Sequence, residues 1–241
     1  MDQQLKQLQD WISESRHIVF FGGAGVSTES GIPDFRSVDG LYHQQYAFPP
    51  ETILSHSFFE RNPEEFYRFY RSKMLFPQAR PNAAHWKLAE LEAAEKLTAV
   101  VTQNIDGLHQ AAGSKTVYEL HGSVHRNHCM KCRRFYGLDF LLETGGVPRC
   151  PACGGVVKPD VVLYEECLDE TTMVGAVEAI AGADMLIIGG TSLAVYPAAG
   201  LIRYYCGNRL ALINKSATPY DREAGLVINA SLGEVLGAIR V

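Results

Sequence analysis

The chain has 241 residues, 46% of them hydrophobic, and carries a formal net charge of −5 at pH 7. This composition supports a full buried core, and the negative charge disfavours nucleic acid or an anionic membrane as a partner. No apolar run approaches the roughly 20 residues that cross a bilayer, and the polar first residues do not resemble a secretory signal. We therefore expect a cytoplasmic protein that does not bind membranes.

Apolar residues recur along the chain with two different periods. Leu5, Leu8 and Ile12 follow helical spacing, whereas residues 17–21 form an apolar run of strand length that leads into a glycine-rich turn. These patterns predict helices at residues 3–15, 82–95 and the C-terminus, and strands at residues 17–21, 97–101, 184–188, 209–213 and 225–228, with helices between the later strands. The alternation predicts an α/β fold with a parallel sheet covered by helices on both faces.

Two stretches interrupt this alternation. Residues 37–81 are rich in aromatic residues and prolines, with a helical patch around Phe66, Phe69, Tyr70 and Met74. Residues 122–160 contain four paired cysteines and little apolar periodicity. We interpret both stretches as insertions that pack together into a smaller second lobe.

The four paired cysteines have the spacing of a zinc site. Cys129 and Cys132 form one Cys-x2-Cys pair, and Cys150 and Cys153 form another after 17 intervening residues. Four thiolates close a tetrahedral shell and leave no position for water, so the zinc is expected to be structural. The alternatives are disulfides, which a reducing compartment disfavours, or a redox pair, which the duplication disfavours.

Zinc ribbons also bind nucleic acids, so the charge of this segment matters. It contains several basic or imidazole side chains: His125, Arg126, His128, Lys131, Arg133 and Arg134. The whole chain is negative, however, and no aromatic residues alternate with these side chains as a stacking platform. We expect a solvated charged surface and no nucleic-acid partner.

The first strand runs into Gly22-Gly23-Ala24-Gly25, a turn whose backbone can approach a pyrophosphate closely. Taken alone, this signal is weak. Counted from Gly23, the third glycine of the dinucleotide fingerprint is replaced by Thr28, and no acidic residue follows at the end of a second strand about 20 positions on. An ordinary dehydrogenase therefore fits poorly.

Four longer segments are far more specific. Residues 23–36 read GAGVSTESGIPDFR, residues 103–109 read QNIDGLH, residues 119–122 read ELHG and residues 190–197 read GTSLAVYP. In sequence, order and spacing these segments closely resemble the signatures of the sirtuins, which are NAD-dependent protein deacylases. The paired cysteines follow the His-Gly segment, where that family carries its zinc ligands, and the resemblance covers nearly the whole chain.

The resemblance implies both an architecture and an activity. It implies a Rossmann-like large domain from about residues 1–36, 82–121 and 161–241, and a small domain from a helical insertion at about 37–81 and a zinc-binding insertion at about 122–160. It also implies that NAD and an acetylated protein or peptide bind between them and become nicotinamide, O-acetyl-ADP-ribose and free lysine. A sirtuin-like mono-ADP-ribosyltransferase, a deacylase for longer acyl groups and a non-catalytic zinc-ribbon binding module remain alternatives. We expect a monomer.

The resemblance also implies roles for individual residues. His121 is the expected general base, because a neutral imidazole can take a ribose hydroxyl proton, and Asn104 is expected to order the ribose and a water. Phe35 is expected to exclude water from the reacting carbon. The residues expected to bind NAD are Gly23, Ala24, Gly25, Thr28, Asp34, Phe35, Arg36, Gln103, Asn104, Ile105, Asp106, Gly190, Thr191, Ser192 and Asn214.

The substrate side departs from the family pattern. Val161, Val162 and Tyr164 match the segment that pairs with the peptide backbone as an added strand. Glu165, however, stands where the family carries glycine, and its carboxylate is expected to favour peptides with Lys or Arg beside the acyl-lysine. Tyr70 and Lys73 are three residues apart on one predicted helix and match the Tyr-x-x-Arg pair of succinyl-removing sirtuins. Lysine lacks the planar fork of arginine, so acetyl-lysine is the expected substrate.

Overall fold

The computed structural model describes residues 2–34 and 48–241, and its larger sheet has six parallel strands. The strand order is β3-β2-β1-β7-β8-β9, with each neighbouring pair parallel. The strands are β1 (Ile18–Gly22), β2 (Leu97–Thr102), β3 (Val117–Glu119), β7 (Met185–Gly189), β8 (Leu210–Ile213) and β9 (Leu226–Ile228). After β1 the chain adds β2 and β3 on one side of it, and later adds β7, β8 and β9 on the other side. The connections that leave β1 and β7 therefore run in opposite directions, which opens a crevice at the carboxyl ends of these two strands.

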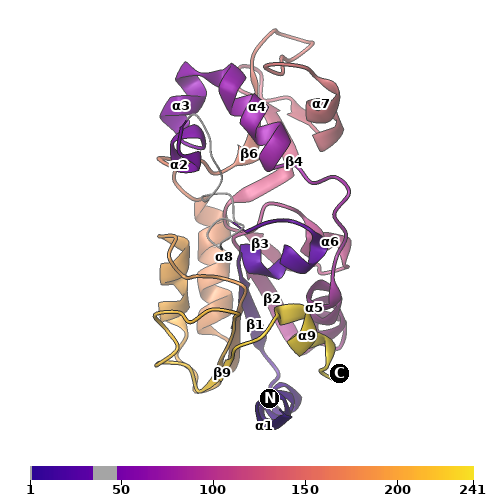
Figure 1. Cartoon of the computed structure of the whole chain (residues 1–241), viewed down its shortest axis with the longest axis vertical. Coiled ribbons are helices and arrows are strands. Elements are labelled where there is room, and N and C mark those ends of the chain that lie inside the picture. Colours follow the sequence, from indigo (N-terminus) through magenta and orange to yellow (C-terminus); the bar gives the residue numbers. More distant parts are fainter. Residues whose placement is uncertain (1, 35–47) are drawn as a thin grey trace.

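Helical elements cover both faces of this sheet, as predicted (Figure 1). One face carries α1 (Asp2–Glu14), α5 (Ala83–Ala93) and α9 (Leu232–Gly237), and the other carries α8 (Glu170–Ala181) and the 3₁₀ segment η4 (Ala198–Tyr204). Each face forms a hydrophobic core with its helices: the first core lies under α1, α5 and α9, and the second lies under α8 and η4. Successive β1 side chains point to opposite faces, so Phe20 packs into the first core and Phe21 into the second.

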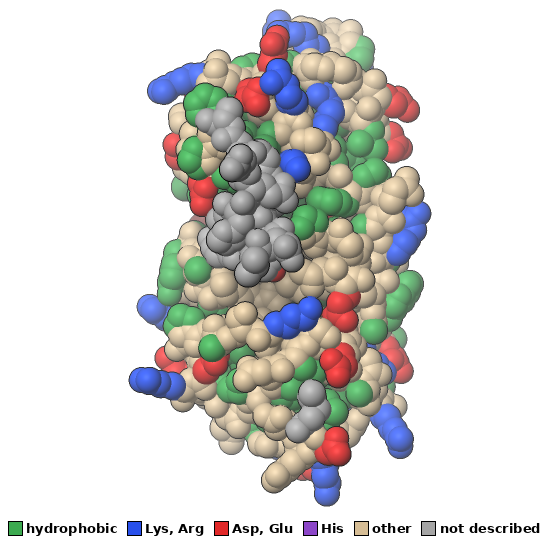
Figure 2. Space-filling view, in the orientation of Figure 1, with side chains coloured by type: hydrophobic (Ala, Val, Ile, Leu, Met, Phe, Trp, Pro, Cys, Tyr) green, Lys and Arg blue, Asp and Glu red, His purple; other side chains and the backbone are tan. Residues whose placement is uncertain are grey.

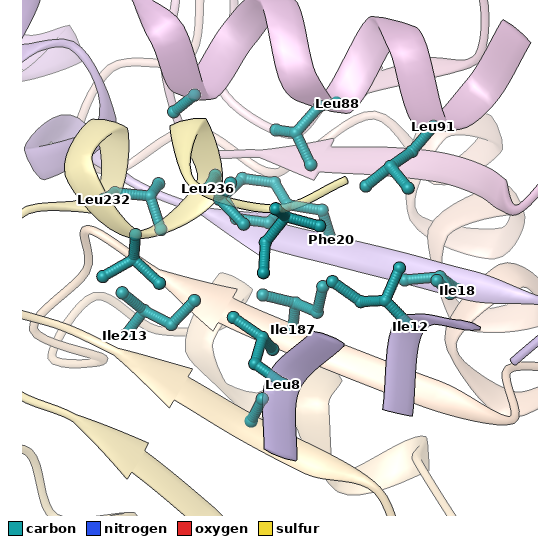
Figure 3. Close-up of a cluster of buried hydrophobic side chains, with 14 of the residues drawn as sticks. Leu8, Ile12, Ile18, Phe20, Leu88, Leu91, Ile187, Ile213, Leu232 and Leu236 are labelled. Carbon is teal, nitrogen blue, oxygen red and sulfur yellow. The ribbon is translucent and has the colours of Figure 1, made fainter. Parts of the chain in front are cut away.

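The first of these cores is continuous from α1 to α9 (Figure 3). Leu8 and Ile12 from α1 meet Phe20 from β1 and Leu236 from α9, and all four are buried. Full burial of one such side chain contributes roughly 1.5–3 kcal/mol. The apolar residues Leu8 and Ile12, whose spacing predicted the helix, are therefore the residues that α1 buries against the sheet.

A second, smaller sheet lies at the other end of the molecule (Figure 1). It is antiparallel, in the order β5-β4-β6, and consists of β4 (Gly122–Cys129), β5 (Phe135–Tyr136) and β6 (Val157–Val161). Four helices pack with it around a third core: α2 (Pro50–Ile53), α3 (His56–Arg61), α4 (Pro63–Lys73) and α7 (Leu138–Glu143). The Tyr67 hydroxyl of α4 donates to the Val157 carbonyl of β6. The two predicted insertions thus share one core, although they are far apart in the sequence.

The connections between the later strands differ from the prediction. Only the 3₁₀ segment η4 links β7 to β8, and turns without an α-helix link β8 to β9. Proline cannot donate a helical hydrogen bond, and this limits helix formation at Pro197 in the first connection and at Pro219 in the second. Gly200 also lowers the helix propensity of the first connection. The elements of the larger lobe that were not predicted include β3 and three shorter helical segments: α6 (Leu108–Ala111), η1 (Ala24–Val26) and η2 (Thr28–Ser30).

The surface shows charges of both signs. Figure 2 shows Lys and Arg side chains interspersed with Asp and Glu side chains over the face that it draws. Among residues 2–34 and 48–241, no helix combines the length and the apolar character that crossing a membrane requires.

Candidate active site

A cavity of about 1410 Å³ lies along the carboxyl ends of the parallel strands and extends to β6 of the smaller sheet. Ligands of open α/β sheets bind at this edge because the loops after neighbouring strands converge there. The predicted residues that line the cavity are Gly23, Ala24, Gly25, Thr28, Asp34, Lys73, Gln103, Asn104, Ile105, Asp106, His121, Val161, Val162, Tyr164, Glu165, Gly190, Thr191, Ser192 and Asn214. Residues from seven separate segments of the chain therefore face one space.

The glycines after β1 allow two loops to touch. The Gly25 N–H donates to the Gly190 carbonyl at 2.8 Å, and a Cβ atom on Gly25 would lie 2.8 Å from the Gly190 Cα. Gly190 has a φ angle of +61°, and a Cβ atom there would lie 2.4 Å from the Val26 nitrogen. These glycines therefore serve the contact between the loops as well as any approach to a phosphate.

Side-chain amides join the loops after β2, β7 and β8. Asn214 accepts from the Thr191 N–H at 3.1 Å and donates to the Thr191 carbonyl at 2.6 Å. The Gln103 amide donates to the Thr191 hydroxyl at 3.1 Å. The loops predicted to bind NAD are thus held together as one surface.

His121 follows β3 and is held through one ring nitrogen. Its Nδ1 lies 2.9 Å from the Gln103 carbonyl oxygen, which can only accept, so Nδ1 carries the proton in the neutral ring. Burial lowers the pKa of His121 below its ordinary value, although the bond to Gln103 opposes the shift. The imidazole is therefore neutral at pH 7, and its Nε2 lone pair can accept a proton.

A buried hydrogen-bonded chain links the loop after β2 to the glycine loop. The Asn104 amide donates to the Ser27 hydroxyl at 3.1 Å, and that hydroxyl donates to the Asp106 carboxylate at 2.6 Å. Burial raises the pKa of Asp106, while hydrogen bonds from Ser27 and the Leu108 N–H lower it. The sequence prediction omitted Ser27, although it lies inside the glycine-loop segment next to Thr28.

The four predicted zinc ligands converge at one end of the small sheet. The sulfur atoms of Cys129, Cys132, Cys150 and Cys153 all lie within 4.8 Å of one another. The Cys129–Cys153 and Cys132–Cys150 sulfur distances are 3.4 and 3.7 Å. A tetrahedral shell with Zn–S bonds of about 2.3 Å places sulfurs about 3.8 Å apart, whereas a disulfide requires about 2.05 Å. The donor set fits one structural Zn²⁺, and none of the six cysteines of the chain forms a disulfide.

Comparison with known proteins identifies the family. The Sir2 family model matches residues 23–197, which is more than half of the chain. The chain belongs to the Sir2 family. An NAD-dependent protein deacetylase of Clostridium perfringens (strain 13 / Type A) is 61% identical over 242 residues, which cover 99% of each chain.

Solved Sir2 structures share both the fold and its extent. One, a Sir2 complex with a p53 peptide and NAD+, matches with a TM-score of 0.85 at 41% identity and covers 96% of this chain and 95% of that one. Another, Sir2 bound to an acetylated peptide, has a TM-score of 0.85 at 39% identity, with the same coverage. The Rossmann-like sheet with a zinc-binding lobe, predicted from the sequence, is confirmed.

One described residue predicted from the Sir2 pattern, Tyr70, does not line the cavity. Phe35 and Arg36 lie outside the described residues. Lys73 lines the cavity, but Tyr70 does not: it is fully buried in the third core, where its ring stacks on Phe66 with centroids 5.5 Å apart. The structure therefore does not bring Tyr70 and Lys73 together as an acyl-binding pair.

The segment that the sequence predicts to bind the peptide continues β6. Val161 is buried, Val162 donates its N–H to the His121 carbonyl at 3.0 Å, and Tyr164 is exposed at the cavity. Glu165 accepts two hydrogen bonds from Ser57, so its carboxylate is bound within the protein. These contacts join the segment both to the residue predicted as the base and to the helical insertion.

Proposed function

We propose that this chain is an NAD-dependent protein-lysine deacetylase that produces nicotinamide, O-acetyl-ADP-ribose and the deacetylated lysine. The observation that carries the proposal is the neutral His121, whose Nε2 is available in a cavity lined by both the glycine loops and the 161–165 segment. A relative of 61% identity bears the name of this activity, and solved Sir2 structures hold NAD+ and acetylated peptide.

In this proposal the glycine loop approaches the pyrophosphate of NAD, and the adenosine half is lined by Thr191, Ser192 and Asn214. Asn104 orders the ribose and a water, and Ile105 and Asp106 contact the nicotinamide carboxamide. Nicotinamide is a good leaving group because it departs neutral from a cationic ring. The chain contributes orientation, since the Asn104–Ser27–Asp106 hydrogen bonds fix two polar groups relative to each other. Burial around Asp106 and His121 also limits the access of water.

His121 then acts as the general base. By then the amide oxygen of the acetyl-lysine has replaced the departing nicotinamide on the ribose. The Nε2 of His121 takes the proton of a ribose hydroxyl, so that this oxygen can attack the carbon of the acyl group. The bond from that carbon to the lysine nitrogen then breaks and a water molecule adds, which releases the free lysine amine and O-acetyl-ADP-ribose. The Gln103 carbonyl holds the tautomer that leaves Nε2 unprotonated. Val161, Val162 and Tyr164 receive the peptide as an added strand beside β6.

The zinc ion, held by the four cysteine thiolates, stabilises the small lobe and takes no part in the reaction. We also propose domain boundaries near residues 36, 81, 121 and 160. The protein is further proposed to be monomeric and cytoplasmic and to bind no nucleic acid.

Product analysis tests the proposed reaction. Mass spectrometry of a reaction with NAD and an acetyl-lysine peptide should detect O-acetyl-ADP-ribose in amounts equal to the deacetylated peptide. Release of free acetate from the start of the reaction, or ADP-ribose attached to protein with the peptide still acetylated, would refute it.

A further inference from the structure

Glu165 has a backbone conformation that glycine normally supplies. Its φ angle is +76°. It is the third residue of a four-residue turn, which the Glu166 N–H closes by donating to the Leu163 carbonyl at 3.0 Å. Turns with positive φ at the third position favour glycine, and a strained side chain persists there only when its surroundings hold it. Contacts of Glu165 should therefore explain why a glutamate is tolerated.

The carboxylate of Glu165 adds a second cap to α3, beside the N-cap Ser55, whose hydroxyl accepts from the Phe58 N–H. One oxygen of the Glu165 carboxylate accepts from the Ser57 N–H at 2.9 Å, and the other accepts from the Ser57 hydroxyl at 3.0 Å. Ser57 lies in the first turn of α3, where backbone N–H groups have no partner within the helix and a negative charge is favoured. A side chain 108 positions away in the sequence thus completes the start of this helix.

The neighbours of Glu165 bind the same part of the helical insertion. The Tyr164 N–H donates to the Leu54 carbonyl at 3.0 Å, and the His56 N–H donates to the Tyr164 carbonyl at 2.9 Å. The His56 ring lies 2.8 Å from the Glu166 carboxylate. The 163–166 turn is therefore attached to residues 54–57 by three consecutive residues, and Glu165 is the member at the strained position.

All four residues of the 163–166 turn line the cavity and directly follow the 161–162 segment. We propose that Glu165 is a positioning residue for the peptide substrate: by capping α3, it holds the 163–166 turn in the orientation that receives the acetylated peptide. This inference rests on the proposed function. In this proposal Glu165 acts through the orientation of the turn, with both carboxylate oxygens bound to Ser57, so its effect should be equal for peptides with and without a charge beside the acetyl-lysine.

The test compares Glu165→Gly with the wild type on two acetylated peptides that differ only in having Arg or Ala beside the acetyl-lysine. Glycine accepts the positive φ angle, so this variant keeps the turn and loses only the cap. The peptide KM should rise roughly three- to tenfold, and equally, for both peptides, as expected for loss of a partly exposed charged hydrogen-bond pair. The kcat and the KM for NAD should stay within about twofold of the wild type, as expected for a positioning role.

Further variants separate the cap from general effects of charge. Ser57→Ala removes one of the two hydrogen bonds and should raise the peptide KM less, whereas Glu165→Gln keeps an acceptor and should restore most of the affinity. Glu64→Gln is the matched control, because Glu64 is exposed in the first turn of α4 and is predicted to leave the KM unchanged.

Two results would overturn the inference. An unchanged peptide KM in Glu165→Gly would show that the cap does not position the substrate. A rise confined to the Arg peptide would show direct ionic contact between Glu165 and the peptide. If the wild type does not deacetylate either peptide, the proposed function fails, and calorimetric Kd values of the same peptides for the same variants still test the cap.

Discussion

Two buried histidines beneath the loop that follows β2 should make the fold sensitive to acid. His85 of α5 and His109 of α6 are fully buried, with ring centroids 4.7 Å apart. The Nδ1 atom of His85 accepts from the Asn82 N–H at 3.2 Å, and within the described residues the other three ring nitrogens have no hydrogen-bond partner. Burial lowers the pKa of His85 to about 4; burial, together with the nearby His85, lowers that of His109 to about 3.

These shifts define both the direction and the size of the effect. Because the pKa values are lower in the folded state than the ordinary 6.5, the unfolded chain binds protons first as the pH falls. Stability is therefore complete above about pH 6.5 and declines below it, until the pH reaches the folded-state values. At pH 5.5 each histidine lowers the free energy of unfolding of the protein by about 1.4 kcal/mol, and the pair lowers it by about 3 kcal/mol.

The measurement is urea unfolding of the zinc-loaded protein at pH 7.5 and 5.5. His109→Leu removes one titrating group without breaking a hydrogen bond seen in the structure, so its loss of stability between the two pH values should be about 1.4 kcal/mol smaller than that of the wild type. His17→Gln is the control, because His17 is exposed, and it should follow the wild type. An identical pH dependence in His109→Leu and the wild type would refute the reasoning.

Three other substitutions test the site. Cys129→Ser should lose stoichiometric zinc and unfold the small lobe, because metal-binding energy is folding energy here; a folded, zinc-free and fully active variant would contradict a structural role for zinc. His121→Ala should lower deacetylation by about 10²–10⁴-fold and damage nicotinamide exchange less; wild-type turnover would exclude it as the base. Lys73→Arg should raise desuccinylation about tenfold from a low level, because arginine binds carboxylates in a fork; a wild type that prefers succinyl over acetyl peptides would contradict the expected substrate preference.

The sequence predicted the larger sheet because its central strands are continuous apolar runs. Residues 18–22 and 185–189 are buried along their whole length, and such runs are typical of parallel strands covered on both faces. Strand β3 has only three residues, all partly buried, so it carries no apolar run to detect. The small sheet was missed for a related reason: zinc and helices α2–α4 stabilise it, and its strands show little periodicity.

The site could be predicted only where short-range spacing carries the chemistry. The cysteine pairs and the motif around His121 are local patterns, so both were found in the sequence. The roles of Ser27 and Ser57 depend on partners 79 and 108 positions away, Asp106 and Glu165, and no local pattern encodes those contacts. The sequence marked Glu165 as unusual, but only the structure shows which helix it caps.

The most direct measurement is nicotinamide release from NAD by the purified chain, with and without a panel of acylated lysine peptides. We predict release only in the presence of an acyl-lysine peptide, fastest with acetyl-lysine, and one nicotinamide for each lysine deacetylated. Nicotinamide release that proceeds without any acylated peptide, accompanied by ADP-ribose on protein, would contradict a deacetylase.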